Sequence, residues 1–176
     1  MKEACAMQAL FKPHCSFRLG AVVIATVLSV STVQAETSAS ENASAAANTQ
    51  VQFPANPTAG AHYATVTRGS TREELYTSHE AIAAARAGEP LPNGTTIVLE
   101  DFRDDTLFRY VIMEKQAGFG EQVPEHQRTG DWLFREFAPD GTPNASVDGS
   151  RCMSCHQSQS ANDFVFTLDR MKAYSD

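Results

Sequence analysis

Five consecutive residues near the end of this 176-residue chain could carry chemistry: Cys152-Met153-Ser154-Cys155-His156. Two cysteines separated by two residues can each form a thioether to one vinyl group of haem, and a histidine directly after them can give an imidazole nitrogen to the iron. The motif predicts haem c, one per chain and covalently attached, with Cys152 and Cys155 as the attachment residues and His156 as the iron ligand.

Two other interpretations of the motif stay open at this point. It resembles half of a zinc site, but zinc usually takes four nitrogen or sulfur ligands, and the sequence has no second close cysteine pair and no closely spaced histidine pair. A thioredoxin-like dithiol needs the motif to open a long helix in a βαβ unit near the start of the fold. Here only about 20 residues follow the motif.

The beginning of the chain has the features of an export signal. Lys2, Lys12 and Arg18 form a positive flank, residues 19–33 are apolar or small, and Val33-Gln34-Ala35 is a small-residue cleavage pattern. Residues 1–35 are therefore predicted to be a signal peptide. The alternative is an uncleaved anchor, but the apolar run is shorter than the roughly 20 residues that span a bilayer, so no stable membrane anchor is expected. Export predicts a periplasmic protein, and haem c attachment also requires export.

Removal of that segment changes the cysteine count and the charge. Cys5 and Cys15 leave with it, so only the two motif cysteines remain. The whole chain has 14 Lys and Arg and 21 Asp and Glu, and the signal segment contains three basic residues and one acidic residue. The remaining chain therefore has 11 basic and 20 acidic residues, a formal charge of −9. Nucleic acids and anionic membranes bind proteins that carry clustered positive charge, so neither is an expected partner.

The remaining chain divides into a leader and one domain. Residues 36–58 are rich in Ala, Ser, Asn and Thr and are predicted to be a flexible leader, and residues 59–176 to form the domain. A helix is predicted over 72–87, capped by Ser70 or Thr71 and ended by Gly88. Strands are predicted over 95–102, 107–115 and 131–137, with a hairpin at 104–106. The expected fold class is α+β, a small antiparallel β-sheet with one or two helices packed against it and a C-terminal haem-attachment segment.

The order of several segments resembles a known family. Asn93-Gly94-Thr95-Thr96-Ile97 precedes a Trp strand at 130–134, then the Cys-x-x-Cys-His motif, then Asp163-Phe164-Val165-Phe166-Thr167. Over about residues 60–172 this is similar to the cytochrome P-460 family, which includes the c-prime-beta cytochromes. The resemblance implies a haem held against an antiparallel sheet, often in a homodimer. It also implies that His156 binds one face of the iron and leaves the other open to a small molecule.

One position departs from the family's pattern. Members that oxidise hydroxylamine carry a lysine cross-linked to the haem, and the matching position here is Leu99. Hydroxylamine oxidation is therefore disfavoured, and Lys115 and Lys172 are expected to be solvated surface residues.

The open iron face is expected to be apolar, with Leu99 and Ile97 on one side of their strand. Such a pocket suits nitric oxide or a similar small gaseous or nitrogen-oxide ligand. Phe164 and Phe166 are expected to pack against the haem, and Arg151 could pair with a haem propionate.

The predicted function is thus a periplasmic mono-haem c-type cytochrome that binds such a ligand and exchanges electrons with a periplasmic redox partner. Two alternatives stay open. One is a haem enzyme that oxidises a small nitrogen compound. The other is a six-coordinate electron carrier, for which Met113 is the main candidate for the second axial ligand.

Overall fold

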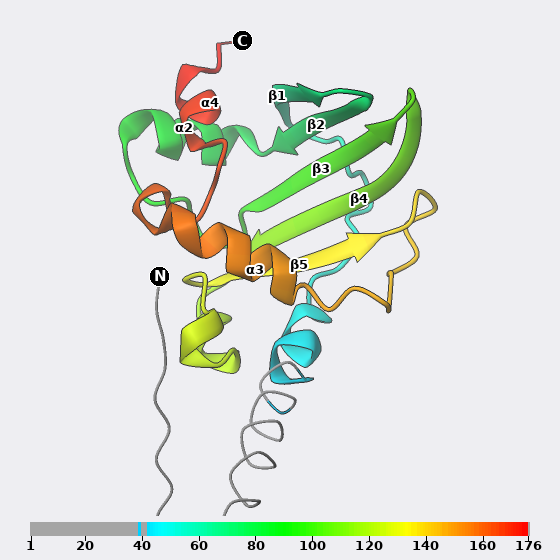
Figure 1. The fold of residues 1–176 in the computed structure, drawn as a ribbon. Helices are drawn as coiled ribbons and strands as arrows, with labels where there is room; N and C mark the ends of the chain where they lie inside the picture. Colours follow the sequence, from blue (N-terminus) through cyan, green and yellow to red (C-terminus); the bar gives the residue numbers. More distant parts are fainter. Residues whose placement is uncertain (1–38, 40–41, 176) are drawn as a thin grey trace, which may run out of the picture.

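A five-stranded antiparallel sheet forms the centre of the computed structural model, which describes residue 39 and residues 42–175 (Figure 1). The strands follow one another in space as they do in sequence: β1 (Ala61–Arg68), β2 (Thr71–Thr77), β3 (Thr96–Arg103), β4 (Thr106–Lys115) and β5 (Trp132–Phe137). The helices are α2 (His79–Ala87), α3 (Ser150–His156) and α4 (Leu168–Ala173), with three 3₁₀ turns, η1 (Gly120–Gln122), η2 (Glu125–Gln127) and η3 (Gln157–Asn162). The predicted α+β class is confirmed.

The helices pack against different parts of the sheet. Figure 1 shows α3 crossing in front of β4 and β5, while α4 lies beside α2 near the other edge. α4 contacts both α2 and β1, and α3 contacts β5. In the part of the chain that is described, no helix is long and apolar enough to span a membrane.

The first half of the predicted helix 72–87 is wrong, because residues 71–77 form β2. This strand pairs with β1 on one side and β3 on the other, so backbone pairing on both edges outweighs the helical pattern of the residues that follow. The helix α2 instead begins after Ser78, whose side chain accepts a hydrogen bond from the amide of Ala81 at 3.1 Å. It ends, as predicted, at Gly88, which adopts the left-handed conformation (φ 72°).

Strand β1 was not predicted either, whereas β3, β4 and β5 lie within one residue of their predicted bounds. The pairing of β1 with β2 shifts register between His62 and Ala64, which breaks the simple alternation that identifies a strand in sequence. The hairpin between β3 and β4 turns at Asp104 and Asp105, both with positive φ (47° and 59°), as a two-residue hairpin turn requires.

The description of residues 36–58 as a flexible leader needs correction. Residues 42–48 are helical, and Asn48 is 3% exposed. Its side-chain oxygen accepts from the amide of Phe134 at 2.8 Å, and its amide group donates to the carbonyl of Asp148 at 2.7 Å. Val51 is fully buried, and the ring of Phe53 packs against Tyr110 and Phe137. This segment is therefore packed on the domain, while the predicted signal peptide, residues 1–35, lies outside the described residues.

Candidate functional site

Helix α3 carries all three motif residues that could do chemistry. It begins after Gly149, which has a φ of 80° and lies so close to Asn48 and to the carbonyl of Phe134 that a Cβ atom would come within 2.7 Å of both. Met153 is fully buried and fixes the helix on the protein. Cys152 is half-buried and Cys155 exposed, and both are free thiols.

His156 is held in one orientation by a backbone carbonyl. Its Nδ1 lies 2.6 Å from the carbonyl oxygen of Phe164, and since a carbonyl can only accept, Nδ1 carries the proton. The other ring nitrogen, Nε2, is then left with a lone pair when the ring is neutral. Burial lowers the pKa of His156, which favours the neutral ring. A neutral imidazole whose second nitrogen donates to a carbonyl is the usual form of a metal-ligating histidine.

The segment after the motif owes its shape to Asp163. Both Asp163 and Phe164 adopt left-handed backbone conformations (φ 50° and 60°). The Asp163 carboxylate accepts from Lys115 Nζ at 2.7 Å, from the Leu91 amide at 3.2 Å and from Trp132 Nε1 at 3.4 Å. These three contacts tie the turn to the sheet and so place the Phe164 carbonyl beside His156.

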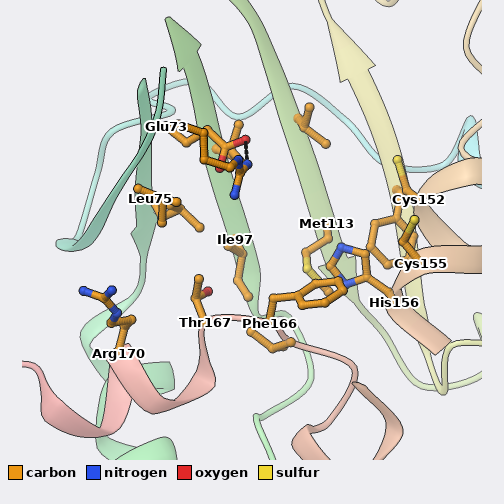
Figure 2. A pocket seen from close by; sticks show the side chains of 16 residues that line it. Glu73, Leu75, Ile97, Met113, Cys152, Cys155, His156, Phe166, Thr167 and Arg170 are labelled. Carbon is orange, nitrogen blue, oxygen red and sulfur yellow. Dashed lines mark hydrogen bonds and ion pairs between the residues drawn. The ribbon is translucent and has the colours of Figure 1, made fainter. Parts of the chain in front are cut away.

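An elongated cavity of about 600 Å³ lies between the sheet and the C-terminal segment, a size typical of cofactor sites. Figure 2 shows the motif residues at one end of it, with Glu73 and Leu75 across the cavity from His156. The walls are mostly hydrocarbon. The side chains that line it are Val66, Leu75, Ile97, Leu99, Val111, Met113, Phe134, Val165 and Phe166, together with Cys152, Cys155 and His156.

Four polar residues also line this cavity, and the sequence did not point to them. Glu73 and Arg68 form an ion pair with 2.5 Å between carboxylate oxygen and guanidinium nitrogen. Thr167 and Arg170 also line the cavity and lie below Glu73 and Leu75 in Figure 2. Glu73 is two residues before Leu75 on β2, so both side chains face the same way. The alternation that places Glu73 and Leu75 on one face is not visible in the sequence, because the pattern of residues 72–87 predicts a helix there.

The structure brings most of the predicted site residues together. Leu99 and Ile97 line the cavity side by side with the motif residues, and so do Phe166 and Met113. Phe166 remains 55% exposed, and its ring lies 5.0 Å from that of His156.

Three residues differ from expectation. The Phe164 ring does not line the cavity but packs on Gly130, and the residue contributes its carbonyl instead. Arg151 is exposed and lines a separate pocket with His126 and Gln157, whereas the arginines that line the cavity are Arg68 and Arg170. Lys115 is not solvated: its side chain is only 14% exposed and is paired with Asp163.

The geometry bears on the two other interpretations of the motif. Among the described residues, no group of three or more His, Cys, Asp and Glu side chains is arranged to hold a bare metal ion. Burial raises the pKa of the Cys152 thiol, whereas a dithiol of the thioredoxin type relies on a lowered one. A cavity lined by hydrocarbon, with two thiols and a neutral imidazole at one end, fits a haem instead.

Comparison with known proteins agrees with this fit. The model of the family described as Cytochrome P460 matches residues 47–167. This range includes the packed segment around Asn48, the whole sheet and the Cys-x-x-Cys-His motif. Comparison with curated proteins gave no match.

Proposed function

Since this chain belongs to the cytochrome P-460 family and is therefore a haem-binding cytochrome, we propose that it is a periplasmic mono-haem c-type cytochrome that captures nitric oxide or a similar small ligand. The observation that carries the proposal is the hydrogen bond from His156 Nδ1 to the Phe164 carbonyl, because it leaves Nε2 as an iron ligand beside the two thiols. The predicted signal peptide supplies the route to the periplasm.

The thiols of Cys152 and Cys155 are the groups that would hold the haem. Each thiol would add across one vinyl double bond of the haem, with the sulfur bonded to one vinyl carbon and the hydrogen to the other. Both cysteines lie on one helix at the end of the cavity, and that cavity extends away from them along the sheet (Figure 2). One haem per chain follows from the single motif.

Once bound, the haem iron supplies a binding position for a small ligand and can change its oxidation state. The side chains across from His156 decide what reaches that position. Most side chains that line the cavity with His156, among them Leu75, Leu99 and Val66, are aliphatic and cannot coordinate iron, which favours a small neutral guest over a protein ligand. Electron exchange with a periplasmic redox partner, and a homodimer of the kind the family often forms, remain predictions.

The positions of Lys115 and Lys172 disfavour the lysine–haem cross-link that the hydroxylamine-oxidising members of the family carry. Lys115 is engaged by Asp163 at 2.7 Å, and Lys172 is an exposed residue of α4 near Asp169. Neither lines the cavity, and Leu99 has no amine to offer.

Absorption spectra of the oxidised and reduced holoprotein, recorded with and without nitric oxide, test this function. We expect a spectrum that changes on addition of nitric oxide to the reduced protein. A low-spin spectrum that no ligand alters would instead support the six-coordinate carrier with Met113. Turnover of hydroxylamine with an artificial electron acceptor would support the enzyme.

A further inference from the structure

The wall of the cavity across from His156 contains one sheltered charge. Glu73 on β2 lines the cavity, and Figure 2 shows its carboxylate on the side opposite the imidazole. Its side chain is 17% exposed, whereas that of its partner Arg68 is 65% exposed. The negative charge therefore lies within the cavity, and the positive charge that balances it lies mostly in water.

The surroundings of Glu73 make this charge effective. Its neighbours along the cavity wall, Val66 and Leu75, are hydrocarbon and cannot screen it. Charges act more strongly where little water reaches them. A carboxylate can accept about four hydrogen bonds, and Arg68 takes one of its two oxygens, Oε1. Glu73 therefore has acceptor capacity left for a guest.

The alternation of β2 explains why the carboxylate faces this way. Glu73 and Leu75 point to the cavity, while Glu74 points to the opposite face of the sheet and pairs there with Arg72 and His62. Two adjacent glutamates thus serve different faces. Of these two glutamates, only Glu73 lines the cavity.

We propose that Glu73 faces the ligand and makes the site select small neutral molecules against small anions, with an added hydrogen bond for a neutral guest that carries an N–H or O–H group. The inference rests on the proposed function, because it needs the position opposite His156 to be open. A donor group on the guest gains a hydrogen bond to the carboxylate, and an anion such as azide is repelled by it. Arg68 moderates that repulsion from the cavity mouth.

Equilibrium titrations of the purified holoprotein test the proposal with three probes: azide as the anion, ammonia near pH 9.5 as the neutral donor, and carbon monoxide as the neutral non-donor. Glu73→Gln should tighten azide binding about tenfold, the change expected for one charge acting over several ångströms at the effective dielectric near a protein surface. Glu73→Leu, which removes the acceptor, should weaken ammonia binding about fivefold or more. Carbon monoxide binding to the reduced protein should stay within about twofold for both variants.

Two further variants sharpen the result. Arg68→Gln removes the cation and keeps the carboxylate, so azide binding should weaken, in the direction opposite to Glu73→Gln. This side chain is largely exposed, so the variant is expected to fold. Glu80→Gln, on the exposed side of α2, is the matched control and should change nothing.

A second measurement does not depend on added ligand. Loss of a negative charge near the iron favours the reduced form, so Glu73→Gln should raise the reduction potential, and Glu80→Gln should leave it unchanged. The proposal is overturned if wild type binds azide and carbon monoxide but Glu73→Gln and Arg68→Gln leave both the azide affinity and the potential at wild-type values. A wild-type spectrum that no probe changes overturns the proposed function together with this inference.

Discussion

The carbonyl oxygen of Phe164 accepts a hydrogen bond from Nδ1 of His156 over 2.6 Å, and the two residues are eight positions apart. Phe164 can point its carbonyl there because it and Asp163 both have positive φ, a conformation that non-glycine residues rarely adopt. The orientation of the imidazole therefore depends on a strained turn, and whatever holds that turn also controls the histidine.

Gly130 is one support of this turn, because the Phe164 ring packs against it. A Cβ atom on Gly130 would lie 2.9 Å from the Phe164 ring, and its φ is +58°. Gly69 has nearly the same φ, +60°, but open space around it. Gly69→Ala should cost about 1 kcal/mol of unfolding free energy through backbone strain alone. Gly130→Ala should cost at least about 1 kcal/mol more, because the ring must also move. Denaturant unfolding of both variants measures the difference, and equal losses would contradict this role for Phe164.

Asp163 is the second support. Asp163→Asn keeps a residue that tolerates positive φ but removes the charge that pairs with Lys115, whose side chain is 14% exposed. We expect a loss of about 1–3 kcal/mol in unfolding free energy. Asp169→Asn breaks a pair on exposed α4 and should change stability by less than about 0.5 kcal/mol. Thermal or denaturant unfolding gives both values, and a neutral Asp163→Asn would show that the ion pair does not hold the turn.

Substitution of Asn48 tests whether residues 42–53 are part of the folded domain. Its side chain pairs the buried amide of Phe134 and the carbonyl of Asp148. Asn48→Ala should cost about 1–3 kcal/mol, because the buried Phe134 amide and the part-buried Asp148 carbonyl both lose their partner. Asn56→Ala, at an exposed position of the same segment, should have little effect. If both variants unfold like wild type, residues 42–53 do not contribute to the folded domain.

The variant Leu99→Phe tests whether a ligand binds in the cavity that Leu99 and His156 both line. Leu99→Phe adds volume to the cavity wall and should slow or weaken carbon monoxide binding to the reduced protein roughly fivefold or more, since overpacking typically costs 1 kcal/mol or more. Phe108→Leu changes an exposed residue of β4 that does not line the cavity and serves as the control. Flash photolysis measures the rates. Unchanged rates in Leu99→Phe would place the ligand elsewhere.

Local patterns predicted the parts of the fold that depend on local interactions. The alternation in residues 107–115 and the two aspartates at the hairpin turn lead directly to β3 and β4. The spacing of Cys152, Cys155 and His156 identified the segment that carries the candidate site, although the sequence did not predict that this segment is the helix α3. The sequence also indicated Gly88 as the end of α2, because a left-handed cap is a property of one residue.

Other features depend on partners far away in the chain. Thr71–Thr77 reads as helical beside the alanines that follow, and only pairing with β1 and β3 makes it a strand. Asn48 is polar, and its burial is explained by partners 86 and 100 residues later. The carbonyl role of Phe164 follows from backbone angles that the side-chain types do not reveal. Glu73 and Arg68 could be assigned to the cavity only once β1 and β2 were in place.

The central claim is that Cys152 and Cys155 hold a haem whose iron is bound by His156. Intact-mass spectrometry of the mature protein, purified from a host with cytochrome c maturation and denatured before measurement, tests it most directly. We expect the mass of the chain plus one haem, with the added mass lost from the Cys152→Ala, Cys155→Ala double variant. A denatured wild-type protein with the mass of the polypeptide alone would contradict the account.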